Sequence, residues 1–246
     1  MRIAVAGATG TVGRHIVAAV AAQGDEVIPL SRATGVDLVS TVGLDAALAG
    51  ADAVIDAVNV STLSADEATR FFTAATGNLA KAAQTAGVRH VVLLSIVGVD
   101  RNPHGYYAGK LAQERALGGS GAPATIVRAT QFHEFAGQIA ERARIGPLPL
   151  APKARVQPIA AAEVGIHLAR MATQPPQGLA RELAGPREEA LDDMVRRWSH
   201  THGQRGWIPS IALPGAQMKG MRAGLNLPGP GAVLGTQTFD EWLAAQ

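Results

Sequence analysis

Short apolar runs alternate with alanine-rich, helix-like segments through the first half of the chain. The runs cover residues 3–6, 27–30, 53–58 and 91–95, and the helical segments cover residues 15–23, 44–48 and 67–86. Runs that are apolar on both faces are typical of parallel strands buried between two layers of helices. Since β-α-β crossovers are almost always right-handed, this order predicts an α/β fold: a doubly wound parallel sheet with helices on both faces. Pro29 lies near the end of its run, where a strand tolerates the missing N–H group.

The composition fits such a sheet and excludes several classes of protein. Hydrophobic residues make up 47% of the 246 residues but aromatic residues only 4%, so we expect a core of Ala, Val, Leu and Ile. The absence of cysteine excludes disulfides and thiolate metal sites. The net charge of +2 is too small to indicate a nucleic-acid partner, and no apolar run approaches the roughly 18 residues of a membrane helix. We therefore expect a cytoplasmic monomer or homodimer with a small-molecule substrate and no membrane or nucleic-acid partner.

The pattern changes in the second half, where proline-rich stretches replace the regular alternation. These stretches cover residues 146–152, 173–178 and 227–231. We expect irregular loops and a few helices there, laid around the C-terminal edge of the sheet, where open α/β sheets bind their ligands. The prediction is a single domain over residues 1–246, in which residues 131–157 and 186–246 contribute a small substrate-binding lid.

A glycine-rich turn at residues 7–13 joins the first apolar run to the first helical segment. Gly7 permits the tight turn, Gly10 lets the backbone approach a pyrophosphate, and Gly13 lets the helix pack closely on the sheet. N–H groups at the positive end of the helix dipole then bind the phosphates. Because the turn follows a strand and opens a helix, it predicts a dinucleotide site rather than a tight β-α turn alone.

The end of the second run indicates which dinucleotide is bound. An NAD site usually has an acidic residue here, whereas this chain has Ser31 and Arg32. Arg32 can pair with a 2′-phosphate that a carboxylate would repel, so NADP(H) is favoured over NAD(H). The alternative is a surface arginine that stacks on the adenine of either cofactor. Asp37 and Leu38 border the adenine in one interpretation, while in the other Asp37 caps the backbone of its turn.

Three features, taken in order, resemble one known superfamily. They are the sequence Gly-Ala-Thr-Gly-Thr-Val-Gly at residues 7–13, Ser95 at the end of a strand, and the Tyr-x-x-x-Lys spacing of Tyr106 and Lys110. Together they resemble the short-chain dehydrogenase/reductase superfamily, and most closely its atypical branch of NmrA-like, NAD(P)H-binding proteins. The resemblance covers at least residues 1–170 and implies a Rossmann-like fold and an NAD(P)-dependent oxidoreductase.

The resemblance implies that Ser95, Tyr106 and Lys110 form a catalytic set. Tyr106 would donate a proton to a substrate carbonyl, and Ser95 would hydrogen-bond the same oxygen. Lys110 lies four residues after Tyr106, hence on the same helix face, where its charge lowers the pKa of a phenol from about 10. Lys110 would also hold the nicotinamide ribose. Tyr107 is the rival for the tyrosine role, with a less suitable three-residue offset.

The resemblance also implies positions along the cofactor. Thr9, Thr11 and the neighbouring Val12 would lie at the phosphates, and Asn59 near the nicotinamide ribose. Asn78, in the middle of the long helical segment, is either a proton-relay residue or a bridge to nearby backbone.

A second group of residues is assigned to the substrate. Gln131, Phe132 and His133 follow a strand end and are predicted to face the nicotinamide. His133 and Glu134 resemble a metal-binding or acid-base pair. No second histidine lies at ligand spacing, however, so we expect no metal.

These features favour an NADP(H)-dependent oxidoreductase that transfers hydride to a small apolar carbonyl or quinone. For a quinone, hydride passes directly and the tyrosine matters less. The alternative is a non-catalytic, NmrA-like nicotinamide-nucleotide redox sensor that binds a partner protein, and the intact Tyr106 and Lys110 pair counts against it. A third hypothesis, an epimerase or isomerase of nucleotide sugars, is disfavoured because the chain is short and lacks a long C-terminal substrate domain.

Overall fold

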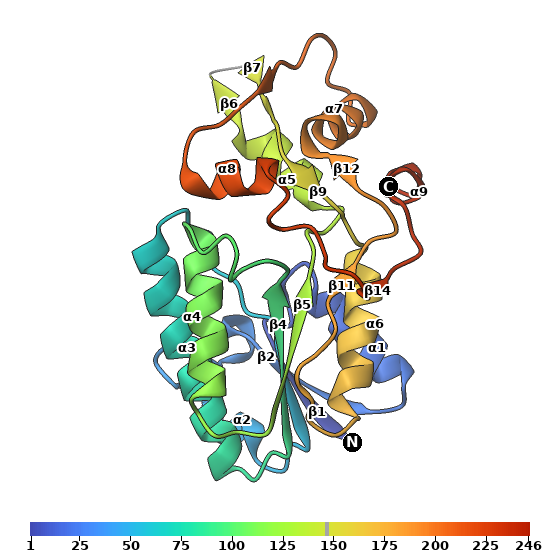
Figure 1. Cartoon of the computed structure of the whole chain (residues 1–246). Coiled ribbons are helices and arrows are strands. Elements are labelled where there is room, and N and C mark those ends of the chain that lie inside the picture. Colours follow the sequence, from blue (N-terminus) through green and yellow to red (C-terminus); the bar gives the residue numbers. More distant parts are fainter. Residues whose placement is uncertain (146–147) are drawn as a thin grey trace. The chain divides into compact units, whose positions relative to one another are not determined.

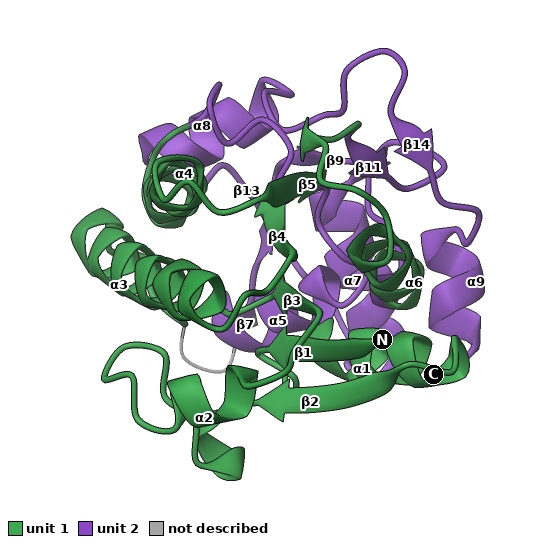
Figure 2. Cartoon of the chain, turned by 90° about the horizontal axis from the view of Figure 1, so that it is seen from below, with its two compact units in different colours: residues 1–95, 103–128, 162–181 green, residues 96–102, 129–161, 182–246 purple. Residues whose placement is uncertain are grey.

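The chain divides into two compact units in a computed structural model that describes residues 1–145 and 148–246. Unit 1 comprises residues 1–95, 103–128 and 162–181, and unit 2 comprises residues 96–102, 129–161 and 182–246 (Figure 2). The two segments predicted to form a lid fall in unit 2, apart from residues 146 and 147, which lie outside the described residues. Their role as a lid stays a prediction.

Unit 1 is built on a parallel sheet with the strand order β2-β1-β3-β4-β5, and β10 lies beside β5. These strands are β1 (Arg2–Ala6), β2 (Glu26–Leu30), β3 (Ala53–Asp56), β4 (His90–Ile96), β5 (Ala124–Ala129) and β10 (Gly178–Leu179). The predicted doubly wound α/β sheet is thus confirmed. All four strands that the apolar runs predicted are present, with ends that differ by one or two residues.

Helices cover both faces of this sheet, as predicted. They are α1 (Gly13–Ala22), α2 (Leu44–Leu48), α3 (Ala65–Thr85), α4 (Tyr106–Gly118) and α6 (Ala161–Ala172). Helices α1 and α6 lie on one face, and α3 and α4 lie together on the other (Figure 1). Both pairs approach closely at a glycine: a Cβ atom added to Gly165 would lie 2.8 Å from the Cβ of His15, and one added to Gly109 would lie 2.5 Å from the Cβ of Ala68.

Strand β2 is the last strand at its end of the sheet and pairs only with β1. Pro29 stands opposite Val5 in that pairing. Since an edge strand needs hydrogen bonds on one side only, the sheet accommodates a proline there without losing a central ladder. The position of Pro29 is therefore explained by the edge as well as by the strand end.

The strand order reverses at β1, which defines where a ligand binds. From β1 the chain passes to β2 on one side and then crosses to β3 on the other. In open α/β sheets the crevice at such a switch point, beyond the carboxyl ends of the strands, is the ligand site. Gly7 and Ala57, the residues that directly follow β1 and β3, lie at this point.

Unit 2 is irregular, as the proline-rich stretches predicted. Its helices are α5 (Phe135–Arg142), α7 (Leu191–Thr201), α8 (Ala216–Arg222) and α9 (Phe239–Ala244). Its strands are β6 (Arg144–Ile145), β7 (Leu148–Pro149), β8 (Ala151–Pro152), β9 (Arg155–Val156), β11 (Leu183–Ala184), β12 (Glu189–Ala190), β13 (Ser210–Ile211) and β14 (Val233–Leu234). A buried hydrogen bond of 2.8 Å from Asn102 to Asn226 ties distant segments of the unit together. No helix of the described residues is long and apolar enough to cross a membrane.

Candidate functional site

The glycine turn after β1 has a backbone that side chains would block. Gly7 has a φ of +78°, and a Cβ atom there would lie 2.7 Å from the carbonyl oxygen of Ala57. A Cβ atom on Gly13 would overlap the carbonyl oxygen of Gly7, whereas one on Gly10 would lie 3.2 Å from that oxygen. Gly7 and Gly13 are therefore required by the path of the backbone, and exposed Gly10 keeps the surface of the turn open.

The same turn leaves N–H groups free at the start of α1. Gly10 donates its N–H to Gly7 at 2.9 Å, but among residues 1–145 and 148–246 the amides of Thr11, Val12 and Gly13 donate to no group. No side chain caps this helix, and its first turn holds no acidic residue. The positive end of the helix dipole is therefore available to an anion, as a bound pyrophosphate requires.

The end of β2 presents one exposed cation. Ser31 caps a short 3₁₀ turn through Thr34, with the N–H of Thr34 donating to the Ser31 hydroxyl at 3.3 Å. Arg32 is exposed, and its side chain has no hydrogen-bond or ion-pair partner in the part of the chain that the structure describes. Its guanidinium is thus free to pair with a phosphate.

Asp37 caps the backbone of its own turn, while the place of Asp37 and Leu38 beside the adenine stays a prediction. Its carboxylate accepts the N–H groups of Val39 at 2.8 Å and Ser40 at 3.1 Å, and these bonds lower the pKa of Asp37. Leu38 is 9% exposed and packs in the core. Asn78 holds this same loop by donating to the carbonyls of Leu38 and Val39, so the structure gives it a bridging role and not a place in a proton relay.

Tyr106, at the first position of α4, reaches across to the loop after β3. Its hydroxyl donates to Oδ1 of Asn59 at 2.8 Å, and its ring packs edge-on against Phe72. Burial raises the pKa of Tyr106, and the neighbouring Tyr107 raises it further. The expected lowering of this pKa by Lys110 is therefore wrong, because burial outweighs it, and Tyr106 is a neutral phenol that donates a hydrogen bond.

Lys110, one turn further along α4, is buried inside unit 1 with 4% of its surface exposed. Its ammonium donates to the carbonyl of Leu94 at 2.8 Å and to Oε1 of Gln113, and it lies 4.8 Å from the centre of the Phe72 ring. Burial lowers the pKa of Lys110 to about 8, against the opposing charges of Asp56 and Glu114. These contacts occupy the ammonium within the protein.

Ser95, at the end of β4, belongs to a buried ion-pair network. Its hydroxyl donates to Oε1 of Glu114 at 2.5 Å, and Arg128 donates to both oxygens of the same carboxylate, at 2.9 and 2.7 Å. Ser95 is 2% exposed. Because a serine hydroxyl carries a single proton, Ser95 cannot donate to a substrate carbonyl while it donates to Glu114.

The members of the predicted catalytic set therefore have separate partners: Asn59 for Tyr106, Leu94 and Gln113 for Lys110, and Glu114 for Ser95. Their catalytic role stays a prediction. The sequence interpretation missed Gln113 and Asp56, which join in a buried network with Thr76, and it gave Glu114 no role. The sequence did contain a signal for Gln113 and Glu114, because residues 106, 110, 113 and 114 share one face of α4 at helical spacing.

The buried ammonium predicts an unusual pH dependence of stability. A lysine with a folded pKa near 8 and an unfolded pKa near 10.5 binds fewer protons when folded, so the free energy of unfolding rises with pH between these values. Between about pH 8 and pH 9.5, the free energy of unfolding of the wild type should rise by about 2 kcal/mol relative to that of Lys110→Met, with a slope of up to about 1.4 kcal/mol per pH unit. Urea unfolding at both pH values measures this.

The matched control for that experiment is Lys81→Met, which removes an exposed lysine from α3. The stability difference between the wild type and this control should not change over the same pH range. If Lys110→Met behaves like the control, the ammonium is not buried as described.

The residues predicted to face the substrate lie in unit 2. His133 is fully buried, with Nε2 at 3.0 Å from the carbonyl oxygen of Gln237, and its ring packs against Phe239 and Trp242. Phe132 forms a bridge with Ile159, and Gln131 is half-buried. No group of three metal-ligating side chains occurs in the described part of the chain. The contact of Gln131, Phe132 and His133 with a substrate stays a prediction.

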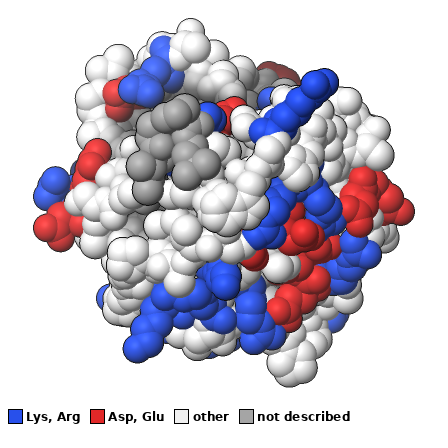
Figure 3. All heavy atoms as spheres, turned by 90° about the horizontal axis from the view of Figure 1, so that it is seen from above, with Lys and Arg blue, Asp and Glu red and all other residues white. Residues whose placement is uncertain are grey.

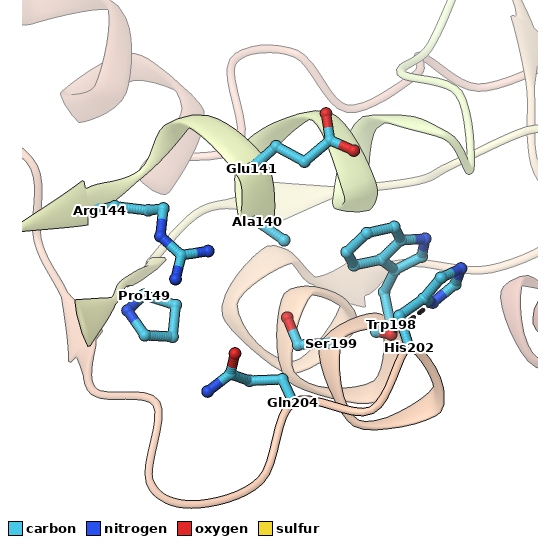
Figure 4. A pocket seen from close by; sticks show the side chains of 8 residues that line it. All are labelled: Ala140, Glu141, Arg144, Pro149, Trp198, Ser199, His202 and Gln204. Carbon is cyan, nitrogen blue, oxygen red and sulfur yellow. Dashed lines mark hydrogen bonds between the residues drawn. The ribbon is translucent and has the colours of Figure 1, made fainter. Parts of the chain in front are cut away.

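Unit 2 also contains a hollow of about 190 Å³ between α5 and α7 (Figure 4). It is lined by Ala140, Glu141, Arg144, Pro149, Trp198, Ser199, His202 and Gln204. Trp198 stacks on His202 with ring centres 3.9 Å apart, and Gly137 packs on it as well. The indole of Trp198 therefore packs against other parts of unit 2. Arg144 and Gln204 contribute polar side chains to the lining of the hollow.

Comparison with known proteins shows the family. Residues 31–175 match the family model described as NAD(P)H-binding. A curated relative from Streptomyces griseus, (4-alkanoyl-5-oxo-2,5-dihydrofuran-3-yl)methyl phosphate reductase, is 35% identical over an alignment of 144 residues that covers 53% of this chain. The aligned region spans about half, 48%, of that relative.

Solved structures of different activities share the fold over nearly the whole chain. The NADPH-dependent quinone oxidoreductase of Escherichia coli, complexed with NADPH, superposes with a TM-score of 0.71 at 20% identity, covering 99% of both chains. A nucleoside-diphosphate-sugar epimerase from Staphylococcus aureus gives a TM-score of 0.70 at 18% identity, again over 99% of both chains. Such identities show the fold alone, and this is the fold that the resemblance predicted. With more than half of its residues matched, the chain belongs to the NAD(P)H-binding family and has the fold of the atypical short-chain dehydrogenase/reductases.

Proposed function

We propose that the protein is an NADPH-dependent reductase that transfers hydride directly to an electron-poor acceptor, a quinone or a carbon–carbon double bond conjugated with a carbonyl. The observation that carries this proposal is the open glycine turn at the switch point of the sheet, with free N–H groups on Thr11, Val12 and Gly13. When bound, the dinucleotide supplies the hydride. The residues of the turn hold its phosphates and so fix its position.

The contacts of α4 favour such an acceptor over a simple ketone. Reduction of a ketone needs an acid at the carbonyl oxygen. The raised pKa of Tyr106 makes it a weaker acid, and the hydroxyl of Ser95 already donates its hydrogen bond to Glu114. A quinone or conjugated acceptor spreads the charge that hydride brings, and water can then supply the proton. The printed name of the Streptomyces relative describes an oxo-dihydrofuran carrying an alkanoyl group, a ring of this chemical class, and the Escherichia coli protein is named as a quinone oxidoreductase.

Replacement of Tyr106 by Phe tests this proposal. NADPH oxidation with a benzoquinone or an α,β-unsaturated ketone should fall by less than about tenfold, whereas loss of a general acid costs about a hundredfold or more. Steady-state kinetics of the wild type and Tyr106→Phe with these acceptors, and with a simple ketone, give the comparison. Tyr107→Phe is the control, since it removes a neighbouring buried hydroxyl. A drop beyond a hundredfold in Tyr106→Phe alone would instead support the Ser-Tyr-Lys set.

Arg32 determines the choice of NADPH over NADH in this proposal. Its side chain is exposed and unpaired, and a charge-assisted hydrogen bond to a phosphate contributes about 1.5–3 kcal/mol. Arg32→Ala should therefore weaken NADPH binding by about 10- to 100-fold and leave NADH binding within about threefold. Fluorescence titration with both nucleotides measures this, with Arg70→Ala, an exposed arginine on α3, as the control. Equal losses for both nucleotides would mean that Arg32 stacks on the adenine.

The non-catalytic redox sensor remains a second candidate, because one observation favours it. Lys110 is held by Leu94 and Gln113 inside the protein, as a residue with a structural role would be. A sensor binds NADPH at the glycine turn with Arg32-dependent affinity but turns over none of the acceptors. The kinetic panel therefore separates the two functions.

A further inference from the structure

A second hollow in unit 2 has no role in the proposed reaction. It has a volume of about 390 Å³ and is lined by Lys153, Ala154, Arg155, Asp192 and Arg222. This volume is within the usual range for small-ligand sites, about 300–1,000 Å³. Its lining is strongly basic, with three cations and one carboxylate.

The backbone that carries these side chains is firmly held. Lys153 donates its N–H to the carbonyl of Ile211 at 2.8 Å, and Leu191 donates to that of Ala154 at 3.0 Å. Strand β9, which contains Arg155, pairs with β12. Elements far apart in the sequence thus fix the backbone of Lys153, Ala154 and Arg155.

Both acidic groups near the hollow already have an arginine of their own. Glu188 accepts two hydrogen bonds from Arg155, at 2.6 and 2.9 Å. Asp192 accepts the hydroxyl of Ser210 at 2.5 Å and pairs with Arg196 at 3.4 Å. Lys153 and Arg222 therefore form no ion pair with a residue that the structure describes.

Several donors around the hollow also lack an acceptor. In the described part of the chain Lys153 has no side-chain partner, and Arg222 uses only Nη1, which donates to the carbonyl of Leu213 at 2.7 Å. Arg155 is held by Glu188 through Nε and Nη2, which leaves Nη1 unused. Figure 3 shows that Lys and Arg side chains mix with Asp and Glu in one area of the surface and gather with few of them in another.

We propose that this hollow is a binding site for a phosphate group, distinct from the glycine turn of unit 1. The unused Nε and Nη2 donors of Arg222 suit two oxygens of a phosphate, Arg155 adds its single free Nη1 donor, and Lys153 adds a mobile point charge. The group is either free phosphate or the phosphate of an organic ester. The proposal does not depend on the reductase activity, because it concerns residues of unit 2 alone.

Calorimetric titration with inorganic phosphate tests the site in protein saturated with NADP⁺, which keeps phosphate out of the glycine turn. The wild type should bind phosphate, and Lys153→Met/Arg222→Met should bind it at least about tenfold more weakly. Lys153→Met alone should show a smaller loss, and this variant alters an exposed side chain without a partner, so the fold is kept. Lys219→Met on α8 is the control, since it removes an exposed cation that does not line the hollow.

Two results would overturn the proposal. One is equal loss in the control and in the Lys153 variants, which would mean attraction by surface charge only. The other is phosphate binding that NADP⁺ abolishes completely, which would assign it to the glycine turn. Titration with phenyl phosphate distinguishes the sources: tighter binding than phosphate indicates an organic ester, and equal binding indicates free phosphate.

Discussion

Gly13→Ala is expected to abolish NADPH binding and to destabilise the protein. The added methyl group would overlap the carbonyl oxygen of Gly7 and would also crowd the backbone of Ala8 at 2.9 Å. Backbone cannot move aside as a flexible side chain can, so α1 must shift away from β1. We expect NADPH affinity to fall at least about a hundredfold, and the free energy of unfolding to fall by about 1–3 kcal/mol, as for other overpacked sites. Fluorescence titration and urea unfolding measure the two effects.

Two further glycine variants separate the causes. Gly77→Ala in α3 adds a methyl group with nothing within 4 Å, so it should leave NADPH binding unchanged and stabilise the helix by about 0.5–1 kcal/mol. Gly10→Ala, with its Cβ atom 3.2 Å from the Gly7 carbonyl, should fold normally but still weaken NADPH binding. Normal affinity in Gly13→Ala would show that the dinucleotide does not bind at this turn.

Local sequence patterns predicted the first four strands and the first three helices of unit 1, but not β5, β10 or α6. Helix α2 has the predicted bounds, residues 44–48. Helix α3 begins two residues before the prediction because Ser64 caps it by accepting the N–H of Glu67 at 3.3 Å. Alternating apolar runs, caps and glycine stops are properties of neighbouring residues, so they can be recognised without knowing the tertiary contacts.

The contacts of the candidate site could not be predicted in this way. The spacing of Tyr106 and Lys110 places them on one face of α4, but it does not show what packs against that face. Lys110 loses solvent because β4 and Phe72 cover it, and Ser95 meets Glu114 across 19 residues of sequence. Such partners come from different elements, so only the assembled unit shows that a residue of a catalytic pattern is already bonded within the protein.

The division of the chain into two units also could not be predicted from the sequence pattern. Unit 2 collects residues 96–102, 129–161 and 182–246. The first of these segments follows β4 directly and shows no change in composition. It belongs to unit 2 because Asn102 and Val97 bond to Asn226 there. Hydrogen bonds to Asn226, more than a hundred positions away, thus hold residues 96–102 in unit 2.

The Glu114–Arg128 pair is expected to be the most costly polar interaction to break in unit 1. Both side chains are about nine-tenths buried, at 8% and 10% exposure, and the pair is bidentate. Glu114→Gln removes the carboxylate that accepts two hydrogen bonds from Arg128, so this buried ion pair is lost. The free energy of unfolding should fall by about 3–5 kcal/mol, which lowers Tm by about 10 °C in a protein of this size.

A compensating variant shows whether the cost comes from the unpaired charge. Ser95→Ala/Glu114→Leu/Arg128→Met replaces the three side chains of these bonds and should recover most of the lost Tm, because apolar replacements of a buried pair are often neutral or stabilising. Arg89→Met breaks an exposed pair with Asp52 and should leave Tm nearly unchanged. If the triple variant is as unstable as Glu114→Gln, the loss reflects packing and not charge. If it is stable and still reduces quinones with NADPH, then Ser95 has no part in hydride transfer.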